Sequence, residues 1–185
     1  VQARSLIFQS NAVPLEVRAR AALRLTRFAG LGLNTAFFIS TGAEANENAL
    51  KLALRITGRR KVVAIEGSFH GRTAAAGAVT WGAARKWYGF PQAPFDVEFV
   101  PRGDFAAIDR IIGTDTAAVI VEPVQGVGGA LDLGEPFLAA LRAGLAEKGY
   151  VEGRNLTIAA RYADGDVERV PALAEELARI HGRVE

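Results

Sequence analysis

Residues 40–47 combine a tight turn of small side chains with the start of a predicted helix, an arrangement that can bind an anion. Thr41 and Glu44 have the spacing of a capping box, with Thr41 as the N-cap. Gly42 and Ala43 have little or no side chain, so an anion can approach their backbone N–H groups, and helix N-termini bind phosphate through such groups. The segment is a candidate phosphate cradle, although a well-capped helix without a ligand would have the same sequence.

A second segment, from Gly67 to Thr73, places an aromatic ring, an imidazole and a guanidinium within four residues. Phe69 can stack on a flat ring, and Arg72 can bind a carboxylate through two parallel hydrogen bonds. His70 lies between them in the sequence. Equally, Phe69 would suit a protein core and Arg72 an ordinary surface.

A third segment follows an apolar stretch and contains two polar side chains, Glu122 and Gln125, before a glycine-rich run. Glu122 would be costly to bury without a partner, and Gln125 offers both a donor and an acceptor. The alternative is a polar strand exit that leads into a flexible loop.

The elements that must position these segments alternate along the chain. Apolar spacing, prolines and glycines predict helices and strands in turn. The predicted helices are 15–28, 44–56, 72–81, 105–112, 137–147 and 167–180, and the predicted strands are 36–39, 62–65, 97–100, 117–121 and 156–161, with a glycine-rich loop at 126–134.

Strands 62–65 and 117–121 are apolar on both faces, which is typical of a parallel sheet covered by helices on both sides. The predicted fold class is therefore α/β, a three-layer sandwich with a mostly parallel sheet. Ligands in such sheets bind where strands end and helices begin, and all three segments lie at such places.

Composition excludes several classes of protein. The 185 residues include no cysteine and two histidines, which argues against a metal site, and the net charge of +2 is too small for a nucleic-acid-binding surface. No stretch has the roughly 20 apolar residues of a membrane span. The N-terminus has no signal-peptide pattern, so we expect a cytoplasmic protein without membrane or nucleic-acid partners.

Taken together, the three segments resemble the acetylornithine and ornithine aminotransferase group of the class-III, fold-type-I aminotransferases, which use pyridoxal 5′-phosphate (PLP). The resemblance covers about residues 1–142 and rests on the runs FFISTGAEANENALKLA, GSFHGRTAAAGAVT and AVIVEPVQGVGG. It implies a partial large domain of that fold. It also implies transfer of an amino group between acetylornithine-like or ornithine-like donors and 2-oxoglutarate.

The resemblance also assigns roles by position. It implies that Thr41, Gly42 and Ala43 hold the cofactor phosphate, that Phe69 stacks on the pyridine ring with His70 beside it, and that Arg72 binds the substrate α-carboxylate. Glu122 and Gln125 are implied to lie near the ring. Relatives build their active site at a dimer interface, so self-association is expected.

The family's lysine that forms the Schiff base, and the aspartate that holds the ring nitrogen, have no counterpart in this sequence. The lysines are Lys51, Lys61, Lys86 and Lys148, and none stands in the family's lysine context. Val127 also stands where many relatives have glutamate. We therefore expect no catalytic residue here and no turnover by this chain alone.

Residues 141–180 resemble instead a periplasmic substrate-binding component of ABC-type transporters, through the runs EKGYVEGRN and PALAEELARI. This predicts two parts, a partial aminotransferase domain at 1–142 and a strand–helix appendage at 143–185. The alternatives to an aminotransferase are a transporter-type module that binds a small ligand and a non-functional chimeric fragment.

Overall fold

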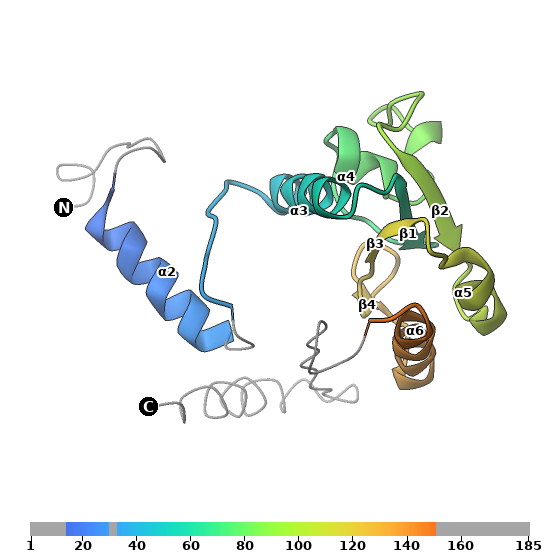
Figure 1. Ribbon diagram of the computed structural model, residues 1–185. Coiled ribbons are helices and arrows are strands. Elements are labelled where there is room, and N and C mark those ends of the chain that lie inside the picture. The colour runs from blue at the N-terminus through green and yellow to red at the C-terminus, as the bar shows by residue number, and fades with distance from the viewer. Residues whose placement is uncertain (1–13, 30–32, 151–185) are drawn as a thin grey trace. The chain divides into compact units, whose positions relative to one another are not determined.

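The computed structural model describes residues 14–29 and 33–150. The chain divides into two compact units, one of Val1–Phe38 with Thr157–Glu185 and the other of Ile39–Leu156. In the first unit the described element is α2, Glu16–Ala29, which confirms the helix predicted at 15–28. Figure 1 shows this helix and the elements of the second unit.

The second unit contains a three-stranded parallel sheet in the order β2-β1-β3. Its strands are β1 (Lys61–Ile65), β2 (Asp96–Val100) and β3 (Thr116–Ile120). Its helices are α3 (Gly42–Thr57), α4 (Ala74–Ala78), the short 3-10 helix η1 (Ala83–Arg85), α5 (Phe105–Ile111) and α6 (Glu135–Glu147).

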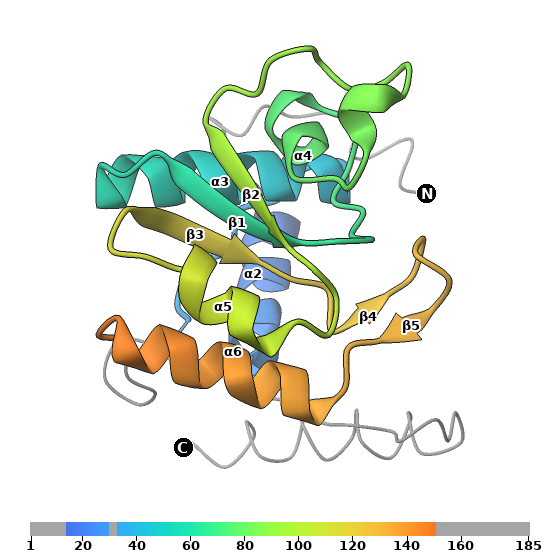
Figure 2. The same ribbon diagram turned by 90° about the vertical axis from the view of Figure 1, so that its right-hand side faces the viewer.

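Helices cover both faces of this sheet, which confirms the predicted three-layer α/β fold (Figure 2). Alternate residues of β1 point to opposite faces because side chains alternate along a strand. Val62 and Ala64 pack with Leu50 of α3 and Ala75 of α4, whereas Val63 and Ile65 pack with α5 and α6. All four of these β1 side chains are fully buried, which explains why β1 has no alternating polar residues.

At the carboxyl ends of β1 and β3, the chain leaves the sheet toward opposite faces. The chain runs from β1 through α4 to β2, and then returns through α5 to β3 on the other side of β1. The segment after β1 therefore leaves toward one face of the sheet, and the segment after β3 leads to α6 on the other. In open α/β sheets, ligands bind in the crevice at such a switch point.

Three sequence predictions need correction. The expected strand at 36–39 has no ladder partner among the described residues, and an extended segment needs a neighbouring backbone to become a strand. The expected helix at 72–81 is reduced to Ala74–Ala78, because Thr80 N donates to Gly77 O in a tighter turn and Trp81 N leaves the helical pattern to donate to the carbonyl oxygen of Ser68. The glycine-rich loop predicted at 126–134 contains a short strand, β5 (Leu131–Asp132), which pairs antiparallel with β4 (Val124–Gln125) just before the loop.

The other predicted elements within 39–150 are confirmed to within a few residues. The strand predicted at 156–161 and the helix predicted at 167–180 lie outside the described residues. In the part of the chain that the structure describes, no helix is both long and apolar enough to cross a bilayer.

Candidate functional site

The first turn of α3 adopts the capping box that the sequence predicts. Thr41 Oγ1 accepts a hydrogen bond from Glu44 N at 3.1 Å, and Glu44 Oε2 accepts from Thr41 N at 3.2 Å and from Ser40 N at 2.8 Å. Helical geometry leaves the N–H groups of Gly42 and Ala43 without an intrahelical acceptor. A Cβ atom added to Gly42 would meet nothing within 4 Å, so the helix start is open to a ligand.

The segment that leaves β1 packs directly on this helix start. Gly71 has a φ of +133°, and a Cβ atom there would lie 2.6 Å from Ala43 Cβ and 2.9 Å from Ala43 Cα. Asn46 Nδ2 donates a hydrogen bond of 2.7 Å to the carbonyl oxygen of His70. The closeness of the two backbones explains why a glycine stands at position 71.

These two segments enclose a hollow of about 560 Å³, a size typical of sites for small ligands. Six of the residues singled out in the sequence line it together: Thr41, Gly42, Ala43, Phe69, His70 and Arg72. Asn46, Gly71 and Thr73 complete the lining. The residues that the sequence places 26 or more positions apart therefore meet at one surface.

His70 is the most unusual of these side chains. It is only 6% exposed, and its Nε2 atom is buried without a hydrogen-bond partner among the described residues. Buried polar atoms in proteins are normally paired, so this atom points to a missing partner such as a ligand. Burial lowers the pKa of His70 below its ordinary value of 6.5, and the nearby Glu122 carboxylate offsets this only in part, so His70 is neutral at pH 7.

Arg72 lies on the exposed side of the hollow. Its guanidinium is stacked over the ring of Trp87, with 5.9 Å between Cζ and the ring centroid, and Trp87 itself is 85% exposed. A guanidinium held in this way keeps its N–H donors available for an anion, which is the chemistry expected for a carboxylate clamp.

Glu122 and Gln125 do not line the hollow but support it from the end of β3. Glu122 Oε1 accepts a hydrogen bond of 2.6 Å from Phe69 N, which ties the segment after β3 to the segment after β1. Gln125 is fully buried, and its Nε2 donates 2.8 Å to the carbonyl oxygen of Glu66 while its Oε1 accepts from Arg102 at 3.4 Å. Both side chains thus hold the backbone of the segment after β1, Gln125 at Glu66 and Glu122 at Phe69.

Three supporting residues were missed by the sequence analysis: Asn46, Glu47 and Thr80. Thr80 Oγ1 accepts from His70 N at 2.9 Å. Glu47 Oε2 accepts from Thr73 Oγ1 at 2.6 Å and from Ala75 N and Ala76 N at 2.9 and 3.2 Å. A run of three polar residues at 46–48, one turn into a helix, was the signal that could have indicated Asn46 and Glu47.

None of the four lysines lines the hollow. Lys61 lies at the opposite end of β1, where Nζ contacts Asp115 Oδ1 at 2.9 Å and donates to the Ile111 carbonyl oxygen at 2.8 Å. Its partial burial disfavours the charged form, but Asp115 and Glu98 outweigh this and raise the pKa of Lys61 above its ordinary value of 10.5, so it is a protonated structural residue. Lys51, Lys86 and Lys148 are exposed.

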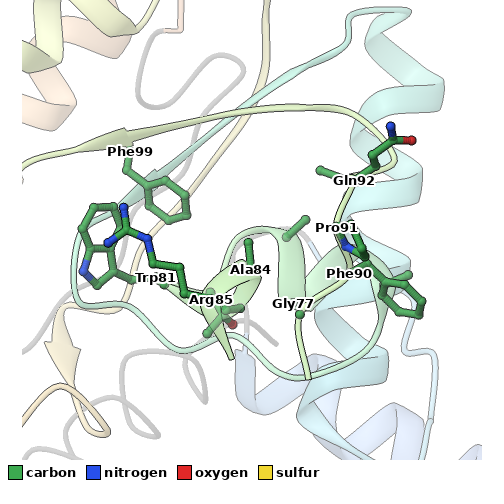
Figure 3. A pocket seen from close by; sticks show the side chains of 15 residues that line it. Gly77, Trp81, Ala84, Arg85, Phe90, Pro91, Gln92 and Phe99 are labelled. Carbon is green, nitrogen blue, oxygen red and sulfur yellow. The ribbon is translucent and has the colours of Figure 1, made fainter. Parts of the chain in front are cut away.

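A second hollow, of about 340 Å³, lies beside α4 and η1 (Figure 3). Trp81, Arg85 and Phe99 stand at one end of it, and Phe90, Pro91 and Gln92 at the other. Arg85 is the only titratable side chain in its lining, so this hollow has no group that could transfer a proton near neutral pH.

Comparisons with known proteins show the family to which this chain belongs. The model of the "Aminotransferase class-III" family matches residues 1–151. The chain belongs to the class-III aminotransferase family. An acetylornithine aminotransferase from Methanopyrus kandleri is 45% identical over 141 residues, which are 76% of this chain and 36% of the relative. The chain therefore spans about a third of the length of the curated relatives it matches.

Solved structures of transaminases show the same fold. A transaminase from Virgibacillus matches with a TM-score of 0.70 and 27% identity over 80% of this chain and 38% of that one. A taurine:2-oxoglutarate aminotransferase from Bifidobacterium kashiwanohense, in complex with PLP and glutamate, matches with a TM-score of 0.64 and 27% identity, over 80% and 39% of the two chains.

The family match includes all of α6 and extends beyond the boundary that the sequence analysis placed after residue 142. The resemblance of residues 141–180 to a transporter component finds no support in these comparisons, and most of that segment lies outside the described residues. The division into 1–142 and 143–185 stays a prediction.

Replacement of Gly71 by alanine tests the close packing of the two segments. Gly71→Ala should lower the free energy of unfolding by more than about 2 kcal/mol, because it combines a strained φ with a clash against Ala43. Gly58→Ala is the matched control, since Gly58 also has a positive φ of +67° but nothing lies within 4 Å of its added Cβ atom. That control should cost about 1 kcal/mol. Equal losses in urea unfolding would show that the contact is not tight.

The titration of His70 provides a second test. We expect its imidazole to take up a proton only below pH 6.5, as followed by NMR, with His181→Gln used to assign the two histidines. Because the unfolded chain binds this proton more readily than the folded chain, stability should fall as the pH drops below about 6.5, and His70→Gln should remove that part of the dependence. A His70 pKa at or above 6.5 would contradict the burial of its ring.

Proposed function

We propose that this chain forms the cofactor-binding part of an aminotransferase that moves an amino group between an amino acid and a 2-oxo acid. The observation that carries the proposal is the meeting of Thr41–Ala43 with Phe69, His70 and Arg72 around one hollow. The curated relatives named acetylornithine aminotransferases support an acetylornithine-like or ornithine-like amino donor. The partner substrate would then be 2-oxoglutarate, as the resemblance implies.

The residues present fit PLP. A dianionic phosphate would accept hydrogen bonds from the free N–H groups at the start of α3, where the helix dipole also favours negative charge. Phe69 provides an aromatic surface for a planar ring, and the unpartnered His70 Nε2 offers a hydrogen-bonding atom beside it. When bound, PLP would supply the electron sink that aminotransferase chemistry needs.

The chain's own residues would bind and orient the cofactor and the substrate, and would not react with them. Arg72 would hold a substrate carboxylate at the exposed side of the hollow, and Glu122 would fix Phe69 through its backbone N–H. Because no lysine lines the hollow, we propose that this chain alone binds PLP without a covalent link and does not catalyse turnover.

We also propose that copies of this chain associate. Along α3, Ala45, Ala49, Leu52 and Ile56 form an exposed apolar stripe at helical spacing, in which Leu52 is 60% and Ile56 78% exposed. Exposed apolar patches of this kind favour contact with another protein surface. A second copy of the chain would cover the stripe and remove it from water.

A PLP titration tests the proposed function. The chain should bind PLP saturably, and borohydride reduction followed by peptide mapping should label no lysine stoichiometrically. Stoichiometric labelling of one lysine would show that the chain carries its own covalent site, and the absence of saturable binding would refute cofactor binding by this chain.

The open space at Gly42 allows a sharp control for this titration. Gly42→Asp should weaken PLP binding at least about tenfold through charge repulsion with the phosphate, whereas Gly42→Ala should leave it nearly unchanged. An aspartate in the first helical turn does not harm the helix, so lost binding would not reflect unfolding. Equal affinities for the two variants would place the phosphate elsewhere.

Sedimentation tests the association. The wild-type chain should sediment as a species larger than a monomer at micromolar concentration, and Ile56→Glu should shift it toward the monomer. Arg55→Glu changes the neighbouring exposed residue and should not have this effect. A monodisperse wild-type monomer would contradict the proposal.

A further inference from the structure

Glu47 connects the helix that carries the phosphate-binding turn to the segment that carries Arg72. It lies in the second turn of α3, and its Oε2 atom accepts three hydrogen bonds from residues 73–76, from Thr73 Oγ1, Ala75 N and Ala76 N. These donors stand 26 to 29 positions later in the sequence. One carboxylate oxygen therefore joins two elements that the chain order keeps apart.

Helix α4 depends on this contact because it has little stability of its own. It is five residues long, and its N-cap Thr73 makes no side-chain hydrogen bond to the helix. A helix of that length does not form without outside support. Burial of Glu47 opposes its ionisation, but the hydrogen bonds from Thr73, Ala76 and Ala75 outweigh this and lower its pKa below 4.5, so the carboxylate is charged at pH 7.

Arg72 is held on both sides by α3. Immediately before it, Gly71 packs against Ala43 and the carbonyl oxygen of His70 accepts from Asn46. Immediately after it, Thr73 donates to Glu47. The first two turns of α3 thus fix the backbone on both sides of Arg72.

We propose that Glu47 is a positioning residue, which fixes the Arg72 guanidinium relative to the Thr41–Ala43 turn and so sets the separation at which a carboxylate and a phosphate are bound together. This inference rests on the proposed function, in which those two groups belong to the substrate and to PLP. Glu47 itself does not line the hollow.

The first experiment uses the full chain without ligand and observes Arg72 directly. In NMR spectra, Glu47→Ala should shift or broaden the signals of the Arg72 Nε–H and of the Trp87 indole N–H, because Arg72 is stacked on Trp87 in the intact structure. Glu47→Gln keeps one acceptor oxygen and should restore both signals in part. Unchanged signals in both variants would overturn the inference, whether or not the chain binds PLP.

Asp104→Ala is the matched control. Asp104 is also a carboxylate that caps a short helix, since its Oδ1 accepts from Ala107 N at 3.0 Å, but α5 lies on the opposite face of the sheet. This variant should lose a similar amount of stability and leave the Arg72 and Trp87 signals in place. If Asp104→Ala moved them as much as Glu47→Ala, the effect would be general destabilisation and the positioning role would be refuted.

The second experiment separates the two binding functions. Glu47→Ala should weaken binding of acetylornithine to the PLP-loaded chain at least about tenfold, the scale of a lost hydrogen bond to a charged group, while the affinity for PLP changes less than about threefold, and Glu47→Gln should fall between Glu47→Ala and the wild type. Equal losses for both ligands, or none for either, would overturn the inference. Failure of the wild-type chain to bind PLP would instead refute the proposed function, and the ligand-free NMR experiment would still decide the role of Glu47.

Discussion

The packing of residues 69–76 on the first two turns of α3 is the contact on which the site depends. Ala43, Asn46 and Glu47 each hold a different part of that segment, through steric contact with Gly71, a hydrogen bond to the His70 carbonyl oxygen and hydrogen bonds from Thr73, Ala75 and Ala76. Without these contacts the N–H groups of the α3 turn and the guanidinium of Arg72 would have no fixed relation. Binding sites require such pre-organised support.

The sheet also holds the segment that follows β1 in place. Because β1 is central and is buried on both faces, the residues that follow it start from a rigid position. Glu122, at the end of β3, accepts from Phe69 N, and Gln125 donates to the carbonyl oxygen of Glu66. The segment after β1 is therefore held by α3 on one side and by the segment after β3 on the other, as expected at a topological switch point.

The hollow at the start of α3 combines several kinds of binding group. It has the chemistry to bind an anion, a flat ring and a carboxylate, but no lysine side chain in its lining. Under the proposed function, this hollow would hold the cofactor through non-covalent contacts, while the covalent step would need a lysine that the described residues do not place in its lining.

The sequence by itself predicted those elements that depend on residues close together along the chain. The capping box at Thr41 and Glu44, the apolar runs of β1 and β3 and the helices α2, α3, α5 and α6 were all predicted, because caps, periodicity and runs of apolar residues act within one element. Six of the nine residues that line the hollow could be named for the same reason. The resemblance of the three segments to the aminotransferase family then assigned these residues roles in binding the cofactor and the substrate, which the residue types alone left open.

Only the tertiary structure decided how these elements meet. Residues 36–39 had a strand's sequence but no ladder partner among the described residues, and α4 ends early because Trp81 N donates to the distant Ser68 carbonyl oxygen. The roles of Asn46 and Glu47 depend on partners 24 to 29 positions away. The burial that leaves His70 Nε2 unpaired is likewise a property of packing. Such long-range contacts leave no periodic trace in the sequence, because nothing local requires them.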